Sequence, residues 1–228
     1  MLACTLSAQW AWGQSAVETL IEPCPRTNTF PIPNNRGPWD FRTNPGVRMV
    51  ESNHFTPNVE NLEHGNTGTL AAEIAFLLHA FPNHPRGLAT LMRWSIRDKT
   101  PQPGNLDYTV ECYFLRAERF RPDDLIVRML HADYMIQLGR PKDASMQLDY
   151  VAIKAGDNPF THYNLGLLYF QMGRYKDARE QAWAAMDEGM ERKDLIERLR
   201  AKGEWSDPPA SAASAPVDAA SGASAATH

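Results

Sequence analysis

The feature that most constrains the fold of this chain is an internal repeat in its last third. Residues 127–151 match residues 161–185 at an offset of 34: Gly139-Arg140 aligns with Gly173-Arg174, and Lys142-Asp143-Ala144 with Lys176-Asp177-Ala178. A repeat of this length is that of a helix-turn-helix unit, which buries its apolar face by stacking on copies of itself. The repeat therefore predicts an all-α chain built from pairs of antiparallel helices.

Apolar periodicity extends the helical prediction toward the N-terminus. Apolar residues recur at three- and four-residue steps after Thr69, which places one apolar stripe on a helix: Leu70, Ile74, Leu77, Leu78 and Phe81. Two more helices are predicted over about 86–98 and 107–120, separated by a proline- and glycine-rich loop at 100–105. A last amphipathic helix after Gly189, with many charged residues, would shield the end of the core from water.

The two best repeats, residues 125–158 and 159–192, resemble tetratricopeptide repeats. The resemblance is carried by Asn164-Leu165-Gly166-Leu167-Leu168-Tyr169, by Gly173-Arg174-Tyr175-Lys176-Asp177-Ala178, and by Ala182 and Ala185. It implies a short α-solenoid whose function is to hold another protein. Small residues at Ala132 and Gly166 would let the paired helices approach closely, and Gly139 and Gly173 would end the first helix of each pair in the left-handed conformation.

Outside the repeat domain, predicted over 67–205, the chain has an extended arm and a tail. Residues 18–66 form a proline-rich arm, extended to about residue 56, with a short helix that begins at Pro57. The arm contains too many apolar residues for a free linker, among them Trp39, Phe41 and Phe55, so we expect it to lie against the helical body. Residues 206–228 consist mainly of Ala, Ser and Pro and are expected to be disordered.

The N-terminus favours an exported protein, periplasmic or secreted, over a cytoplasmic one, and together with the repeats it suggests a scaffold or assembly factor of the bacterial cell envelope. Residues 1–17 carry no charged side chain, and Ala11-Trp12-Gly13 offers small residues for signal cleavage, although the usual basic region is missing. In a second export interpretation, Cys4 lies in the remnant of a lipoprotein box and carries a lipid anchor. No run approaches the roughly 20 apolar residues that a membrane-spanning helix needs.

Two cysteines leave two alternatives open. In an exported protein, Cys24 and Cys112 are candidates for a disulfide that joins the arm to the helical body. Alternatively, Cys112 is a small buried residue of a helix and Cys24 is a free thiol.

The resemblance implies a partner-binding groove lined by the first helix of each pair. The groove positions are Phe160, Tyr163, Asn164, Leu167 and Phe170 in the last repeat, and Ile126, Met129, Leu130, Asp133 and Ile136 one repeat earlier. Such an aromatic and apolar groove suits an extended peptide or a short helix with bulky apolar anchors. Of the residues with which the family clamps a terminal carboxylate, only Asn164 is present. The alternative is that the N-terminal arm of the same chain fills the groove.

An enzymatic function is the less favoured hypothesis. It would be a metal-dependent hydrolase that uses Glu51, His54, Glu60 and His64, of which Glu60 and His64 lie one helical turn apart. Paired-histidine zinc motifs require a histidine where this chain has Glu60, so solvated helix charges are the simpler interpretation. We therefore expect no catalytic residue, metal or cofactor. A net charge of −4 without a cluster of Lys and Arg argues against nucleic acid as a partner.

Overall fold

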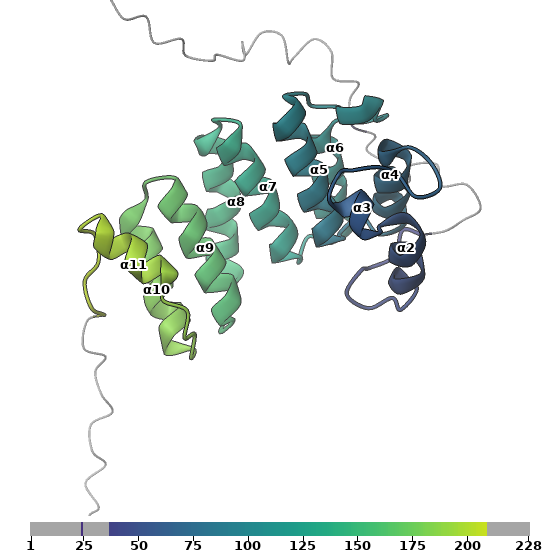
Figure 1. Ribbon diagram of the computed structural model, residues 1–228. Coiled ribbons are helices and arrows are strands. Elements are labelled where there is room, and N and C mark those ends of the chain that lie inside the picture. The colour runs from purple at the N-terminus through teal and green to yellow at the C-terminus, as the bar shows by residue number, and fades with distance from the viewer. Residues whose placement is uncertain (1–23, 25–36, 209–228) are drawn as a thin grey trace, which may run out of the picture.

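The computed structural model describes Cys24 and residues 37–208, and every regular element in this part of the chain is a helix (Figure 1). The elements are α2 (Val47–His54), α3 (Pro57–Glu60), α4 (Leu70–Ala80), α5 (Pro85–Asp98), the 3-10 turn η2 (Pro103–Asn105), α6 (Val110–Phe120), α7 (Leu125–Gln137), α8 (Pro141–Lys154), α9 (Pro159–Gln171), α10 (Tyr175–Asp187) and α11 (Asp194–Ala201). The predicted signal segment 1–17, the arm residues 18–23 and 25–36, and the tail from residue 209 onward lie outside the described residues.

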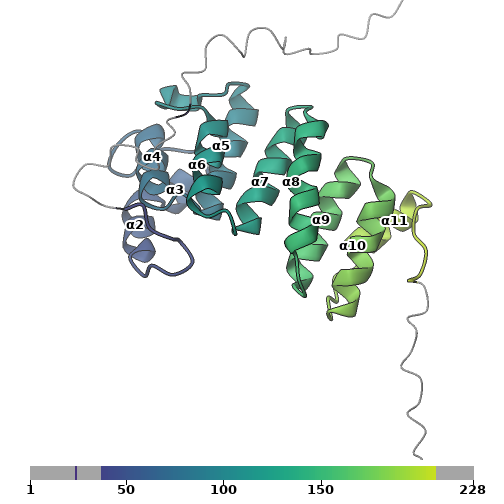
Figure 2. The same cartoon turned by 180° about the vertical axis from the view of Figure 1, so that it is seen from behind.

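The helices from α5 onward form two rows. In one row, α5, α7, α9 and α11 lie side by side, each in contact with the next (Figure 1). The other row consists of α6, which packs on α5 and α7, α8, which packs on α7 and α9, and α10, which packs on α9 and α11 (Figure 2). In the described part of the chain, no helix is both long enough and apolar enough to cross a membrane.

The sequence repeat is visible in the backbone of α7 to α10. Asp124 and Asn158 occupy equivalent positions one repeat apart, and each side chain accepts hydrogen bonds from two N–H groups in the first turn of the next helix, α7 or α9. Gly139 and Gly173 both adopt φ of 73° and end the turn before α8 and α10. Because a residue with a Cβ is strained there, this turn explains the repeated glycine.

A third glycine permits close packing between helices. A Cβ on Gly166 would lie 3.2 Å from the carbonyl oxygen of Ala178 in α10 and 2.6 Å from Cδ2 of Leu195 in α11. This is the close approach that the small residue predicted. Leu195 and Ala178 belong to the second of two hydrophobic clusters, which is built from α7 to α11, while the first is built from α2 to α7.

The arm is more helical than the sequence indicated. Residues 18–56 were expected to be extended, but Val47–His54 form α2, and the short helix at Pro57 is a single turn. α2 packs on α4, and α3 packs on α4 and α5. Burial of Val50 explains why this segment is helical despite its neighbouring prolines, since tertiary contacts stabilise a helix that is marginal alone.

A polar network and three aromatic residues attach the arm to the helical body. The N–H of Phe41 donates to Oδ1 of Asn83 (3.0 Å), and the Asn83 amide donates to Asp40 (2.8 Å) and to Asp124 (2.9 Å), the residue that caps α7. Phe55 belongs to the first cluster, and Trp39 and Phe41 pack against it. The described aromatic residues of the arm therefore lie against the N-terminal half of the body.

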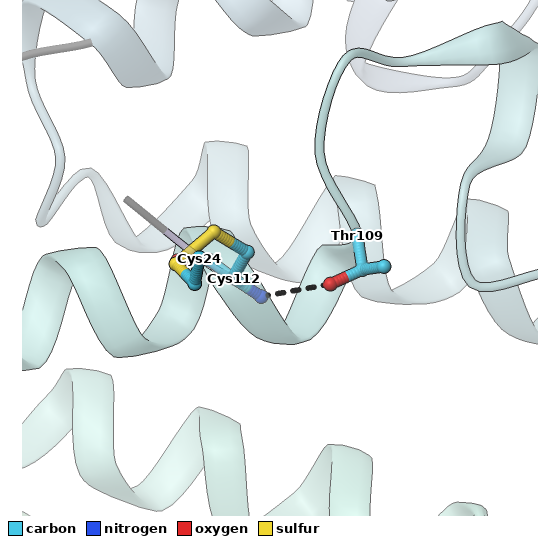
Figure 3. Close-up of a disulfide and its surroundings, with 3 residues drawn as sticks. All are labelled: Cys24, Thr109 and Cys112. Atoms are coloured by element: carbon cyan, nitrogen blue, oxygen red, sulfur yellow. Dashed lines mark hydrogen bonds between the residues drawn. A yellow bond between two sulfur atoms is a disulfide. The ribbon is translucent and has the colours of Figure 1, made fainter. Parts of the chain in front are cut away.

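A disulfide joins Cys24 to Cys112 in the first turn of α6, across 88 residues of sequence (Figure 3). The Cys112 N–H donates to the Thr109 hydroxyl (3.2 Å), which caps the helix. This cap explains why α6 begins at Val110, three residues later than the apolar pattern predicted. The bonded pair, rather than the free thiol, is the state of Cys24 in this structure.

Candidate partner-binding surface

Three helices of the row formed by α5, α7, α9 and α11, namely α5, α7 and α9, present equivalent residues on one face. We number positions from the first residue of each helix, which is Pro85, Leu125 or Pro159. The second, sixth and ninth positions are spaced by four and three residues, so their side chains lie on the same face of the helix. On α5 they are Arg86, Thr90 and Arg93, on α7 Ile126, Leu130 and Asp133, and on α9 Phe160, Asn164 and Leu167.

On α5 the N-terminal arm contacts all three residues of this face. The Arg86 guanidinium donates to the carboxylates of Glu60 (2.8 Å) and Glu51 (3.2 Å) and lies 5.3 Å from the centre of the Phe55 ring. Arg93 donates to the backbone carbonyl of Glu60 (2.7 Å), and the Thr90 hydroxyl lies 3.5 Å from the same oxygen. The arm of the same chain therefore contacts this face at α5, where Thr90 is buried while Arg86 and Arg93 remain exposed.

On α7 and α9 the same face is open in the described structure. Ile126 and Phe160, which occupy equivalent positions in neighbouring repeats, are 51% and 67% exposed. Asn164 is also exposed, while Leu130, Asp133 and Leu167 are half-buried. We refer to these six residues as the α7–α9 face.

Two of the predicted groove residues are in the core instead. Met129 and Tyr163 are only 7% and 2% exposed and belong to the second hydrophobic cluster. The hydroxyl of Tyr163 donates to Asp194 of α11, and the guanidinium of Arg192 lies 4.5 Å from the centre of its ring. Since the next helix of the row covers Tyr163, this residue cannot touch a partner without disruption of the core.

Two further predicted residues are only partly accessible. Ile136 and Phe170 are half-buried and pack against the second cluster, and the Phe170 ring lies 5.3 Å from that of Tyr175. The sequence pattern did not distinguish side chains that pack between neighbouring helices from those that point outward.

Asp133 is the one charged side chain of the α7–α9 face. Its carboxylate accepts a hydrogen bond from the Gln137 amide (3.1 Å), and no ion pair of Asp133 occurs among the described residues. Burial raises the pKa of Asp133 above the usual value of an aspartate. α9 contributes no Asp, Glu, Lys or Arg at all, so the face carries one carboxylate, Asp133, and one amide, Asn164, among apolar side chains.

The four residues of the hydrolase hypothesis do not form one site, although Glu51 and Glu60 both pair with Arg86. Glu51 lies 3.0 Å from Nε2 of His84, His54 lies 2.6 Å from the buried Glu73, and Glu60 pairs with Arg86. Nδ1 of His64 lies 3.0 Å from the carbonyl oxygen of Gly65. Among Cys24 and residues 37–208, no group of three or more His, Cys, Asp or Glu side chains is placed to bind a metal ion. Each of these side chains instead has a partner within the fold.

Comparison with protein-family models, with curated proteins and with solved structures found no match to this chain.

Proposed function

We propose that this protein is a non-enzymatic scaffold of the tetratricopeptide type, which binds a segment of another protein on its α7–α9 face. The repeat interpretation is supported by equivalent features in the two repeats, namely the caps Asp124 and Asn158 and the turns at Gly139 and Gly173. It also agrees with the row of α5, α7, α9 and α11, since stacked repeats place the first helix of each pair on one surface.

The observation that carries the proposal is the exposure of Ile126 and Phe160 at equivalent positions of neighbouring helices. Large apolar side chains that are exposed in register, with half-buried apolar neighbours, are typical of a protein-binding surface. The pair has no role in the core, because each side chain is at least half exposed.

The boundaries of the face limit the size of the partner segment. On one side the arm contacts α5 through Glu60, and on the other Arg192 and α11 cover Tyr163. Packed helices are about 8–10 Å apart, so two helices offer a width of about 20 Å. This accommodates about six residues of an extended peptide at roughly 3.3 Å per residue, or a short helix laid across the face.

We also propose that the protein acts outside the cytoplasm, in the periplasm or as a secreted protein of a bacterial envelope. The uncharged segment 1–17 and the Cys24–Cys112 disulfide both favour an oxidising compartment. The lipid anchor at Cys4 is one form that export could take.

The experiment is a cross-linking pull-down from the native cell with three forms of the full chain. The test variant is Ile126→Asp, Phe160→Asp. The matched control, Met146→Asp, Ile153→Asp, places the same two charges on exposed apolar residues of α8, in the other row, which are 70% and 79% exposed. Circular dichroism first establishes that all three forms are equally helical.

The proposal predicts a discrete partner that is captured by the wild type and by the α8 control, and lost with the test variant. Equal capture by the test variant would show that the partner binds elsewhere. Loss with both variants would point to a nonspecific effect of added charge and would also contradict the proposal.

A further inference from the structure

The contact between the arm and α5 shows how a short segment occupies this face of the row. The segment buries two apolar side chains, Phe55 at 3% and Val59 at 0% exposure. It also brings Glu51 and Glu60 to Arg86, so its charge is complementary to that of the helix it covers. The arm is therefore held against the helical body by burial of apolar side chains together with ion pairs to one arginine.

The α7–α9 face has the opposite chemistry at the equivalent positions. The ninth position is Arg93 on α5 but Asp133 on α7, and the second position is Arg86 on α5 but an apolar residue on α7 and α9. A segment like the arm would place carboxylates beside Ile126 and Phe160, where they would lose hydration without a cation in return. None of the six residues of the α7–α9 face is a cation that could receive an acidic segment.

No Lys or Arg side chain of α7 or α9 is available to receive a carboxylate. Arg128 is the one Lys or Arg in these two helices. Its guanidinium donates to the Pro122 carbonyl (3.2 Å) and to Gln147 of α8 (2.8 Å), and it lies 4.1 Å from the centre of the Tyr150 ring. Arg128 is therefore occupied on the side of α8.

Asp133 supplies the complementary feature for a cation. Its half-buried carboxylate lies on the same side of α7 as Ile126, two helical turns away, and has an amide rather than a cation as its hydrogen-bond partner in the described structure. A partly desolvated carboxylate gains more from a cation than an exposed one, since water screens the pair less.

From this charge complementarity we propose that the segment bound on the α7–α9 face carries bulky apolar residues, which contact Ile126 and Phe160, and one Lys or Arg side chain that pairs with Asp133. This inference depends on the proposed function and adds to it the chemistry of the partner: a basic, apolar segment rather than an acidic one or a terminal carboxylate.

The test uses a displayed library of random 12-residue peptides, selected on the full chain and, in parallel, on three variants. These are Asp133→Asn, Phe160→Asp and, as a matched control, Asp187→Asn at an exposed carboxylate of α10. We expect the wild type and the Asp187→Asn control to select peptides with one Lys or Arg at a fixed distance from two bulky apolar residues. The Asp133→Asn variant should select peptides without the basic preference.

Affinities of one selected peptide then give a quantitative result. We expect Kd to rise about tenfold with Asp133→Asn, as for loss of a partly buried charge pair, and to stay within about twofold with Asp187→Asn. A charge reversal, Asp133→Arg, should abolish binding of this peptide and restore it for the version in which Glu replaces the basic residue.

The outcomes separate this inference from the proposed function. Selected peptides that depend on Phe160 but show no basic preference would overturn the inference and leave the binding face in place. Failure of the charge reversal, with both variants folded, would also overturn it. If no peptide is enriched on the wild type, both the inference and the proposed function fail.

Discussion

Two aromatic residues three positions apart in α9, Phe160 and Tyr163, should respond very differently to replacement by alanine. Both were expected in the groove, yet Tyr163 is 2% exposed and Phe160 is 67% exposed. Removal of a buried aromatic side chain costs about 3–5 kcal/mol, because apolar burial is lost and a cavity remains. Tyr163→Ala also removes the hydrogen bond to Asp194. Phe160→Ala should change the free energy of unfolding by no more than about 0.5 kcal/mol.

Urea unfolding followed by circular dichroism measures this difference. With an m-value of about 2–3 kcal/mol per molar urea, Tyr163→Ala should lower the midpoint by about 1–2.5 M, whereas Phe160→Ala should leave it nearly unchanged. Tyr163→Phe, which retains the ring, should cost only about 1 kcal/mol. Equal losses for Phe160→Ala and Tyr163→Ala would refute the division of α9 into a core face and an open face.

Three further predictions concern the stability of the fold. Asn158→Ala removes the cap of α9 and should cost about 1 kcal/mol in urea unfolding, while Asn158→Asp should cost much less. Gly166→Val should destabilise the protein by about 1–3 kcal/mol, since even a Cβ at this position lies 2.6 Å from Leu195, and this loss should be smaller when it is measured in a Leu195→Ala background. Burial, aided by the charge of Arg116, lowers the pKa of His79 to about 4, whereas a histidine in the unfolded chain has a pKa near 6.5. The free energy of unfolding should therefore be unaffected by His79 above about pH 6.5 and should fall as the pH is lowered toward 4, by at most about 3 kcal/mol. His79→Gln should therefore make the pH dependence of the thermal midpoint less steep over this range, and an unchanged dependence would contradict the assignment.

Much of the helical framework was predictable because its signals are local. The steps of three and four residues from Leu70 onward correspond to α4, and the caps and glycines at an offset of 34 correspond to the ends of α7 and α9. Asn158 and Gly173 act through the backbone of their own turn, so the sequence around them contains the information.

The features that escaped prediction depend on contacts between distant parts of the chain. α5 begins at Pro85 and α7 at Leu125, which is an offset of 40 (125 − 85) rather than 34, because the loop with η2 is longer than the turn in the later pairs. The equivalence of Arg86 and Arg93 with Ile126 and Asp133 was therefore hidden. A sequence signal for this equivalence was present, however, since Pro85 follows the capping residue His84 just as Pro159 follows the capping residue Asn158.

Burial of Tyr163 and the helix α2 within the arm were hidden for the same reason. The tyrosine is covered by Arg192 and Asp194, which come much later in the sequence, and the prolines before α2 outweighed its short apolar pattern. A periodic pattern identifies the side of a helix, but the neighbours on that side are set by tertiary packing.

Photo-crosslinking in the native cell tests the central claim most directly. A benzoylphenylalanine replaces either Phe160 on the α7–α9 face or Met146 on α8, two large apolar residues of nearly equal exposure, 67% and 70%. We predict that irradiation joins the chain to one discrete protein from position 160 and not from position 146. Crosslinks to that protein from position 146 alone, or from neither position, would contradict the assignment of the α7–α9 face as the binding surface.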